Sequence, residues 1–341
     1  MTQLTWLRQN LFSNWYNSLL TIFCSVFIFR LIQSFLFWVI TQAQWRVVQA
    51  NLPLFLVGRF PQSLYWRIWI VLGIIIILSG ITWSVFTKKQ NIIKRKFSKF
   101  IIPALAPTWL LSFPLILWLI GGGLGLQSVS TNLWNGLLLT LLMAVISIVL
   151  SFPLGVLLAL GRTSKLFIIR WFSILYIEIV RGLPLIGILF IAQVMLPLFL
   201  PTDLRLDRLV RGIAGLVLFS AAYMAENVRG GLQSIPRGQT EAAKALGFNT
   251  PLVLILIILP QALRAVIPAI VGQFIGLFKD TSLLSLVGLV ELTGIARSIL
   301  AQPQFLGRYA EVYIFIGLIY WVFCYSMSLA SRRLEKQLNN S

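Results

Sequence analysis

The twenty residues EAAKALGFNTPLVLILIILP, Glu241 to Pro260, decide how this sequence folds and what it does. They begin with a charged, alanine-rich segment of good helix formers and reach a glycine at Gly247. Glycine suits the left-handed residue that follows a helix C-terminus. Pro236 and Pro251 suit the first turns of two helices, and Thr250 is the expected N-cap of the second. The stretch therefore predicts two short helices joined by a tight turn.

The sequence around this stretch is apolar. Hydrophobic residues make up 58% of the 341-residue chain, charged residues 11%, and there is no histidine. A segment of about 20 apolar residues is long enough to cross a bilayer. Eight such segments are predicted, near 18–40, 66–87, 101–120, 134–160, 168–198, 212–229, 265–290 and 311–330. Gly, Pro and charge interrupt the fifth and the seventh. The fold class is therefore an all-α polytopic membrane protein, without the alternating strands of a barrel.

The distribution of lysine and arginine predicts the orientation of the chain, whose net charge is +19. With the N-terminus inside, 17 Lys and Arg residues fall in inner segments and 8 in outer ones. Basic residues collect in cytoplasmic loops, so both termini are expected in the cytoplasm. The basic segment Lys88–Lys99 is interpreted as an inner topology anchor that touches anionic headgroups. Because the basic runs are short and lie between spans, nucleic-acid binding is not expected.

Several sites are not expected in this chain. Cys24 and Cys324 both lie in apolar segments and outside any CxxC pair, which argues against disulfides and metal sites. No cleavable signal peptide is evident. The stretch Gly121–Ser130 lacks the lysine and hydroxyl of a phosphate-binding loop, and no GxxxxGK[ST] occurs. The chain is therefore not expected to bind ATP, a cofactor or a metal. Polar residues become denser after the stretch Gly121–Ser130, so 1–120 is assigned as an accessory region.

The positive-inside orientation places residues 230–262 in the cytoplasm. There Glu241 offers a carboxylate to a charged partner, and Ala242 and Ala243 allow another protein to approach closely. This chemistry favours docking over catalysis. An ordinary amphipathic interfacial helix is the alternative, although it does not require this order of Glu-Ala-Ala, Gly and Pro.

The pattern EAA-x3-G-x9-I-x-L-P resembles the coupling loop of ATP-binding-cassette importer permeases. Its fixed positions are filled by Glu241, Ala242, Ala243, Gly247, Ile257, Leu259 and Pro260. The resemblance implies a type I importer (MetI-like) transmembrane core, whose loop seats in a cleft of an ATPase subunit. It also implies that ATP and Mg²⁺ are used by that separate ATPase, so the chain itself is a translocation subunit and not an enzyme.

Three further stretches are similar to the polar amino-acid permeases, the histidine/glutamine/arginine/opine branch. They are YIEIVRGLPL (176–185), AAYMAENVRGGL (221–232) and FKDTSLLSLVGLVEL (278–292). The resemblance covers 131–335, a module of five spans, and the three extra N-terminal spans look like those of the longer general L-amino-acid permeases. It implies amino-acid import across the bacterial inner membrane. It also implies three partners: the ATPase subunits, a second permease subunit and an extracytoplasmic solute-binding protein.

Charged residues inside spans are costly unless they are paired or face water. Glu178 and Arg181 are three residues apart and are expected to form a structural ion pair on one helix. Tyr223, Glu226 and Arg229 recur every three residues, and Glu226 is expected to pair with Arg229. Solute contact remains the alternative for Glu226. For Arg30 in the first span, the sequence does not decide between snorkelling and a partner subunit.

Lys279 and Asp280 are adjacent and therefore do not face each other on a helix. With the hydroxyls of Thr281 and Ser285 they give the seventh span an unusual density of polar groups. Asp280, Thr281, Ser285 and Glu226 are accordingly candidates for the substrate pathway. For Asp280 the alternative is a structural role in the network around Glu178 and Arg181.

Two other functions remain open from the sequence. An ion-coupled secondary transporter or channel has intramembrane charge but needs no ATPase-docking loop. A membrane receptor or assembly protein needs neither intramembrane charge nor an ATPase-docking loop. The stretch Glu241 to Pro260 is the feature that discriminates among them.

Overall fold

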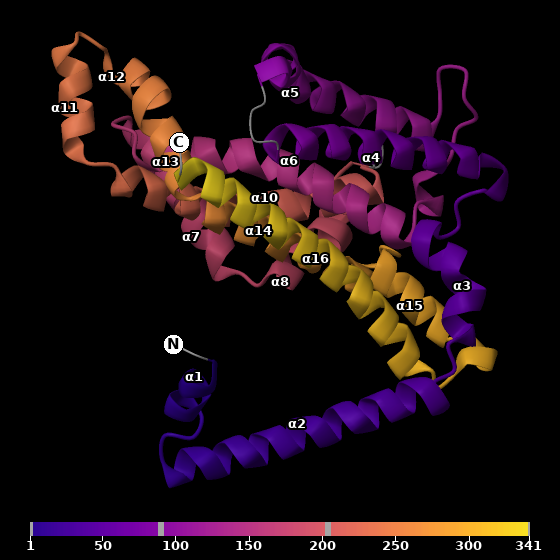
Figure 1. The fold of residues 1–341 in the computed structure, drawn as a ribbon. Helices are drawn as coiled ribbons and strands as arrows, with labels where there is room; N and C mark the ends of the chain where they lie inside the picture. The colour runs from indigo at the N-terminus through magenta and orange to yellow at the C-terminus, as the bar shows by residue number, and fades with distance from the viewer. Residues whose placement is uncertain (1–2, 88–91, 202–205, 340–341) are drawn as a thin grey trace.

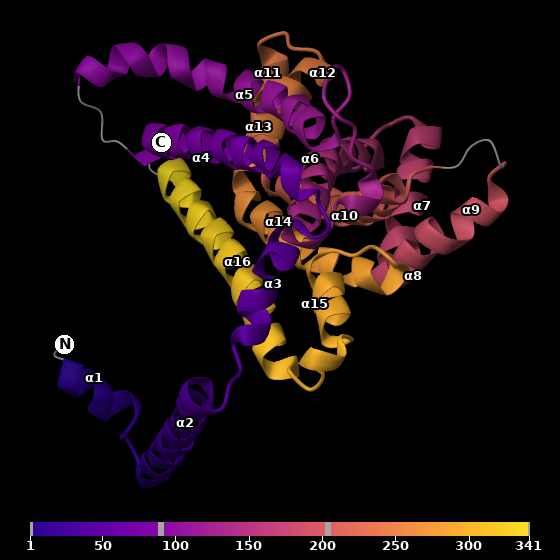
Figure 2. The same cartoon turned by 90° about the vertical axis from the view of Figure 1, so that its right-hand side faces the viewer.

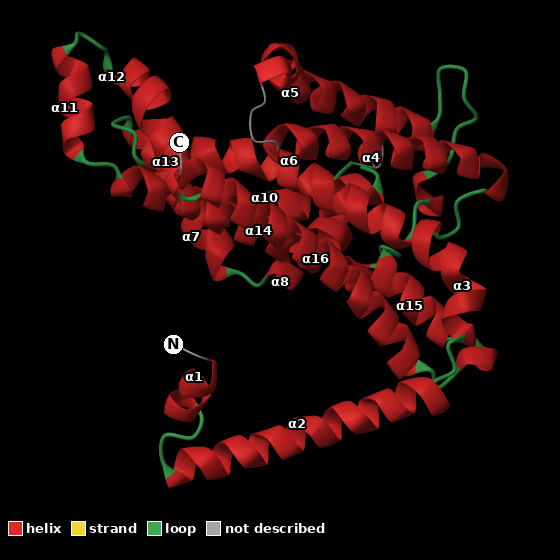
Figure 3. Ribbon diagram, viewed as in Figure 1, coloured by secondary structure: helices red, strands yellow, loops and turns green. Residues whose placement is uncertain are grey.

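The computed structural model describes residues 3–87, 92–201 and 206–339, and these ranges contain helices and loops but no strand (Figures 1 and 3). Six helical segments are long and apolar enough to cross a membrane, or seven when a bent pair is counted as one span. The all-α polytopic prediction is confirmed. The predicted number of eight is approximate, because the apolar helix described in the third segment, Pro107–Gly121, is short.

The helices follow one another in this order: α1 (Gln3–Asn10), α2 (Trp15–Thr41), α3 (Arg46–Val57), α4 (Tyr65–Thr87), α5 (Ile92–Gly121), α6 (Gly136–Arg162), α7 (Phe167–Gly182), α8 (Leu185–Phe190), α9 (Leu196–Phe199), α10 (Arg208–Ser234), α11 (Arg237–Ala245), α12 (Thr250–Leu252), α13 (Leu259–Ala265), α14 (Ile267–Asp280), α15 (Leu292–Leu300) and α16 (Tyr309–Asn339). Of the basic segment 88–99, residues 88–91 lie outside the described residues, and α5 already begins at Ile92.

The two spans that the sequence predicted to be interrupted are both irregular: one is bent at a break, and the other changes from an α-helix to a 3₁₀ helix. The helix α7 ends at Gly182, and the chain bends by 104° before continuing through α8 and α9. Pro184 explains the break, because proline cannot donate the N–H that a continuous helix needs. The helix α14 ends at Asp280 and tightens into a 3₁₀ helix, Thr281–Val287, which Gly288 stops in the left-handed conformation. Such a long 3₁₀ run is uncommon and often marks a hinge.

The helices α6 and α10 form the centre of the bundle. Ala159, Met224, Ala225 and Val228 are all buried where these helices meet. Gly155 makes the contact possible, since a Cβ at this position would stand 2.5 Å from Cβ of Met224. Small residues at helix interfaces let backbones approach closely in membranes, where packing drives association.

Most of the expected accessory region shares the cores of the module that follows it. The helix α3 buries Val47, Val48 and Phe55 against residues of α15 and α16. The helices α4 and α5 contribute Val71 and Leu119, among others, to a second core with α6, α8 and α10. The helix α2 differs: none of its residues is buried, and Figures 1 and 2 show it running apart from the bundle.

The molecule has two distinct ends. In Figures 1 and 2 the hairpin of α11 and α12 projects from one end, and α15 lies at the opposite end. The helix α3 packs against α15 there. The helix α16 links the two ends, since Val312 belongs to the core with α3 and Glu335 borders a pocket beside α13.

Candidate functional site

The stretch Glu241–Pro260 forms the predicted helix–turn–helix. The helix α11 ends at Ala245, and Gly247 takes the left-handed conformation with φ of +85°. The N–H of Gly247 donates to Lys244 O at 2.9 Å, and the N–H of Phe248 donates to Ala243 O at 3.2 Å. These two bonds form a Schellman motif, which satisfies carbonyls that the helix end leaves free. The role expected of Gly247 in the turn is confirmed.

The N-cap of the second helix differs by one residue from the prediction. Asn249, and not Thr250, caps α12, because its side-chain oxygen accepts the N–H of Leu252 at 3.1 Å. Thr250 is the first residue of α12, so Pro251 occupies the second helical position. The helix continues as a π-helix, Val253–Ile258, into α13. Asn249 and Thr250 are both residues that cap helices well, so the sequence alone did not decide which of them precedes the helix.

The two alanines of the loop have different environments. Ala243 is 3% exposed and packs against Val253 and Ile258, so it joins the two halves of the hairpin. This placement corrects the expectation that Ala243 faces a partner. Glu241 and Ala242 are exposed on the opposite side of α11, and Pro260 is exposed at the start of α13. The exposed surface of the hairpin is thus formed by Glu241, Ala242 and the turn, where Leu246 is 78% exposed.

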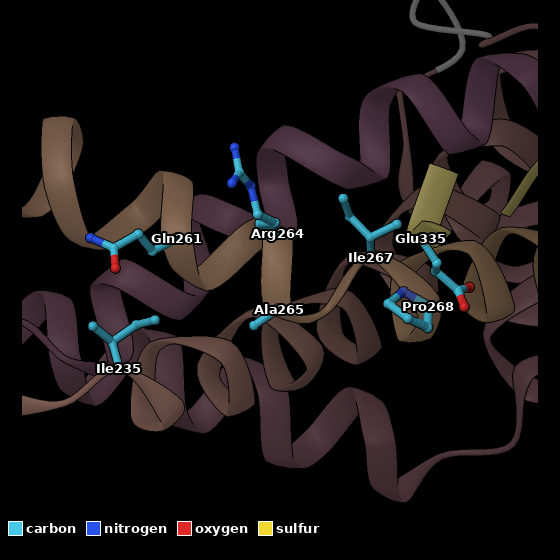
Figure 4. A pocket seen from close by; sticks show the side chains of 7 residues that line it. All are labelled: Ile235, Gln261, Arg264, Ala265, Ile267, Pro268 and Glu335. Atoms are coloured by element: carbon cyan, nitrogen blue, oxygen red, sulfur yellow. The ribbon is translucent and has the colours of Figure 1, made fainter. Parts of the chain in front are cut away.

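A pocket of about 440 Å³ opens at the base of this hairpin. Figure 4 shows the side chains that line it, which come from the end of α10, from α13, from the start of α14 and from the last turns of α16. Its charged groups are Arg264 and Glu335. Gln261 fixes the pocket to the hairpin, since its amide nitrogen lies 3.4 Å from Oε1 of Gln239 on α11. The C-terminal turns of α16 therefore lie beside the base of the hairpin.

A cluster of charges joins α6, α7 and α10. Glu226 accepts from Arg162 at 2.9 Å and from Arg229 at 2.9 Å, and Arg181 lies 3.7 Å away. The pairing of Glu226 with Arg229 is confirmed. Arg162, which the sequence placed in an inner loop, also reaches Glu178 at 2.8 Å. Glu226 is thereby committed to three guanidinium groups, which supports a structural role.

The expected pairing of Glu178 with Arg181 does not occur in the structure. Glu178 pairs with Arg162 of α6, and Arg181 turns to Glu226 and lies over the ring of Tyr223, 5.5 Å from its centre. Spacing along one helix sets which groups can meet, but a better-buried partner on a neighbouring helix competes for them. The side chain of Glu226 is 16% exposed and that of Glu178 is 55% exposed, so Glu226 offers the less screened charge.

The pathway candidates on the seventh span lie where α14 passes into the 3₁₀ helix Thr281–Val287. Asp280 is the last residue of α14 and is half-buried, and it forms no ion pair or hydrogen bond with another described residue. It is therefore not part of the ion-pair cluster around Glu226. Thr281 is fully buried and donates to Phe278 O at 2.6 Å, and Ser285 donates to Ser282 O at 2.9 Å. Both hydroxyls donate to their own backbone, and the carboxylate of Asp280 interacts electrostatically with the adjacent Lys279.

The structure adds a site that sequence reasoning missed. Glu291 lies between the last two spans, is 0% exposed and caps α15 by accepting the N–H groups of Thr293 and Gly294 at 2.9 and 3.0 Å. The hydroxyl of Tyr320 on α16 donates to it at 3.1 Å, and Thr140 of α6 lies 3.5 Å away. Burial raises the pKa of Glu291 to about 7, against the lowering effect of these donors. The available signal was an acidic residue directly before a short helical pattern.

Comparison with known proteins identifies a matching family and similar chains. Residues 151–340 match the family described as "Binding-protein-dependent transport system inner membrane component". The chain is 40% identical over 354 residues to "Inner membrane amino-acid ABC transporter permease protein YhdY" of Escherichia coli K12, covering 98% of this chain and 93% of that protein. It is 34% identical to "Glutamate/glutamine/aspartate/asparagine transport system permease protein BztC" of Rhodobacter capsulatus, with the same 98% and 93% coverage.

A solved structure is also similar. It is described as "Crystal structure of an amino acid ABC transporter with histidines", and it shares 31% sequence identity with this chain at a TM-score of 0.54. The match covers 59% of this chain and 92% of that chain.

Proposed function

The chain belongs to the family of binding-protein-dependent transport system inner membrane components, and on this premise we propose that it is the permease subunit of an ATP-driven importer of amino acids. The observation that carries the proposal is the helix–turn–helix Glu241–Pro260, built as a hairpin whose inner side is packed and whose outer side presents Glu241, Ala242 and Leu246. Such a hairpin suits a cleft in an ATPase subunit, which supplies the hydrolysis of ATP with Mg²⁺.

Two further partners complete the proposed machine. A second permease subunit, identical or related, closes the pathway, and an extracytoplasmic solute-binding protein delivers the solute. The bias of basic residues supports an orientation with both termini and the hairpin in the cytoplasm. The membrane is the bacterial inner membrane. The names of the relatives support amino acids as the solute class.

Within this proposal Asp280 is the group for solute contact. It is a carboxylate at a helix break, with no ion-pair partner among the described residues. An amino acid carries an ammonium group, and a carboxylate in a low-dielectric path attracts it strongly. Glu226 is the weaker candidate, because its charge is already neutralised by arginines.

The test of the proposed function is purification of the native complex from membranes, identification of its subunits and reconstitution into vesicles. Uptake of amino acids is expected only with the ATPase subunits and ATP present, and with the solute-binding protein outside. Competition among unlabelled amino acids then defines the solute. Uptake by this chain alone, driven by an ion gradient, would instead support a secondary transporter.

The role of Asp280 is tested with Asp280→Asn, which keeps the shape and removes the charge. A changed affinity or a changed preference between cationic and neutral amino acids, in a complex that assembles normally, supports solute contact. Ser285→Ala is the matched control, because the hydroxyl of Ser285 is bound to its own backbone. Original selectivity in Asp280→Asn, or failure of that variant to assemble, speaks against contact.

A further inference from the structure

The helix α3 is the part of the N-terminal region that reaches the outer end of the bundle. It is a helix of 12 residues, too short to cross a membrane, and it lies between two predicted spans on the outer side. One face is fixed, because Val47, Val48 and Phe55 are buried against α15 and α16. The backbone N–H of Gln44, just before α3, donates to Glu311 Oε1 at 2.9 Å. The position of α3 is therefore set by the core.

Four arginines surround this contact. Arg46 begins α3, Arg59 follows its end, Arg297 is on α15 and Arg308 directly precedes α16. Arg46, Arg59 and Arg297 are exposed, and none of the four guanidinium groups pairs with another described residue. The bond of Gln44 to Glu311 keeps Arg46 and Arg308 at the same corner of the molecule.

The acidic residues that could neutralise these arginines are not at the surface. Glu311 is 4% exposed and holds the N–H of Gln44, and Glu291 is 0% exposed and holds the start of α15. The outer end that α3 and α15 form thus presents positive charge to the solvent. A surface of one sign attracts a partner of the opposite sign and speeds its association.

The free face of α3 adds an apolar centre to this charge. Gln49, Leu52 and Leu56 recur at intervals of three and four, so they share one side of the helix, next to its buried face. Leu52 and Leu56 are 42% and 40% exposed. An apolar centre bordered by arginines is the composition of a protein–protein interface, in which arginine is enriched and lysine is depleted.

We propose that α3, α15 and the turn before α16 form a basic platform that receives an acidic face of the solute-binding protein. This inference rests on the proposed function, which requires such a partner at the outer end. In this proposal the N-terminal region takes part in transport, because its helix α3 binds the solute-binding protein.

The position of α15 links this platform to the pathway. The N–H of Leu292, the first residue of α15, donates to Oγ1 of Thr140 on α6 at 3.1 Å, and Glu291 is bound to Tyr320 on α16. The same segment follows Gly288, where the broken seventh span ends. A protein that binds α3 and α15 therefore touches an element attached to three helices of the translocation module.

The experiment measures how strongly the solute-binding protein stimulates ATP hydrolysis. The complete complex is placed in nanodiscs of phosphatidylcholine, and the solute-loaded binding protein that stimulates the wild type is titrated. In Arg46→Glu/Arg297→Glu we expect the half-saturating concentration to rise about tenfold, with unchanged basal hydrolysis and a weaker dependence on salt. Arg46→Gln/Arg297→Gln should give a smaller rise, and it decides the question if the first variant does not assemble.

The matched control is Arg8→Glu, which removes an exposed arginine on α1, away from the platform. A half-saturating concentration equal to that of the wild type in both platform variants overturns the proposal. So does a rise that appears only when phosphatidylglycerol is added to the nanodiscs, because the arginines then serve lipid headgroups. If the proposed function itself is wrong, the result is different, because no binding protein then stimulates ATP hydrolysis even in the wild type.

Discussion

Glu226 is the residue through which α6, α7 and α10 are joined electrostatically. Glu226→Gln leaves Arg162 and Arg229 beside a neutral group in a poorly solvated place. Because Glu226 is only 16% exposed, we expect a loss of about 2–3 kcal/mol of stability, below the full cost of a completely buried charge. Thermal unfolding of the purified complex in detergent measures it. Glu178→Gln is the control, with a loss below about 1 kcal/mol because Glu178 is 55% exposed. Equal losses would show that Glu226 is not the centre of the cluster.

Glu291 makes stability depend on pH. Its pKa is raised in the folded protein from 4.5 to about 7. The folded state therefore binds more protons than the unfolded state between these values, and stability falls as pH rises through them. Between about pH 5 and 8 the loss is roughly 2–3 kcal/mol.

Thermal unfolding across that pH range tests this dependence. Glu291→Gln should flatten this part of the pH profile, since the amide stays neutral and its single oxygen still accepts one of the two N–H groups of α15. A profile of the same slope in this variant would assign the pH dependence to another group.

The residue scale also shows where sequence reasoning succeeds. The partnership of Glu226 with Arg229 was predictable because both groups lie on one helix, three residues apart. The partnership of Glu178 was not, because Arg162 belongs to another helix. Glu291 was missed for the same reason: Thr140 and Tyr320, which surround it, are 151 and 29 residues away in the chain.

In the hairpin of α11 and α12 the same residues determine the conformation of the turn and carry the proposed coupling to ATP hydrolysis. Gly247→Val places a β-branched residue at a φ of +85°, which costs of order 1–2 kcal/mol locally and distorts the turn. Glu241→Lys leaves the backbone intact and changes only the exposed charge. We expect both variants to lose uptake and stimulated ATP hydrolysis together, measured in reconstituted vesicles.

Gly238→Ala is the matched control for the hairpin. Gly238 lies in α11 and does not require a positive φ, and a Cβ added to it would meet no atom within 4 Å. Normal coupling is expected in this variant. Normal solute-stimulated hydrolysis in both Gly247→Val and Glu241→Lys, with the complex intact, would remove the hairpin from the coupling pathway.

At the element scale the strength of local signals decided what could be predicted. Gly247 and Pro184 punctuate the chain in ways that only a few backbone conformations satisfy, so the turn and the broken fifth span were predictable. The 3₁₀ helix Thr281–Val287 was not, because nothing in TSLLSLV excludes an α-helix. The register of α12 was ambiguous because Asn249 and Thr250 are both good caps.

The orientation of the whole molecule is tested by cysteine labelling in a background with Cys24→Ser and Cys324→Ser. Gln49→Cys on α3 and Gln239→Cys on α11 both place a thiol at an exposed position. A membrane-impermeant reagent should label Gln49→Cys in intact cells and Gln239→Cys only in inside-out vesicles. The reverse pattern would invert the topology and would also place the basic platform in the cytoplasm.

The domain division at residue 120 is where the sequence was least informative about the whole molecule. Composition changes there, but Leu119 and Phe55 contribute to cores shared with the later module. Composition records the polarity of each segment and says nothing about which apolar surfaces meet. The packing of α3, α4 and α5 against the later helices depends on which apolar surfaces contact one another.

The isolation of α2 has a consequence for the history of the gene. A segment without a single buried side chain can be gained or lost in one recombination event, because no other position must change to accommodate it. The hairpin of α4 and α5 differs, since Val71, Leu119 and Ile120 are buried in a core that also holds residues of α6, α8 and α10. Variation in length among related genes is expected to concentrate before Gln42, and substitutions in the hairpin are expected to follow those in its neighbours.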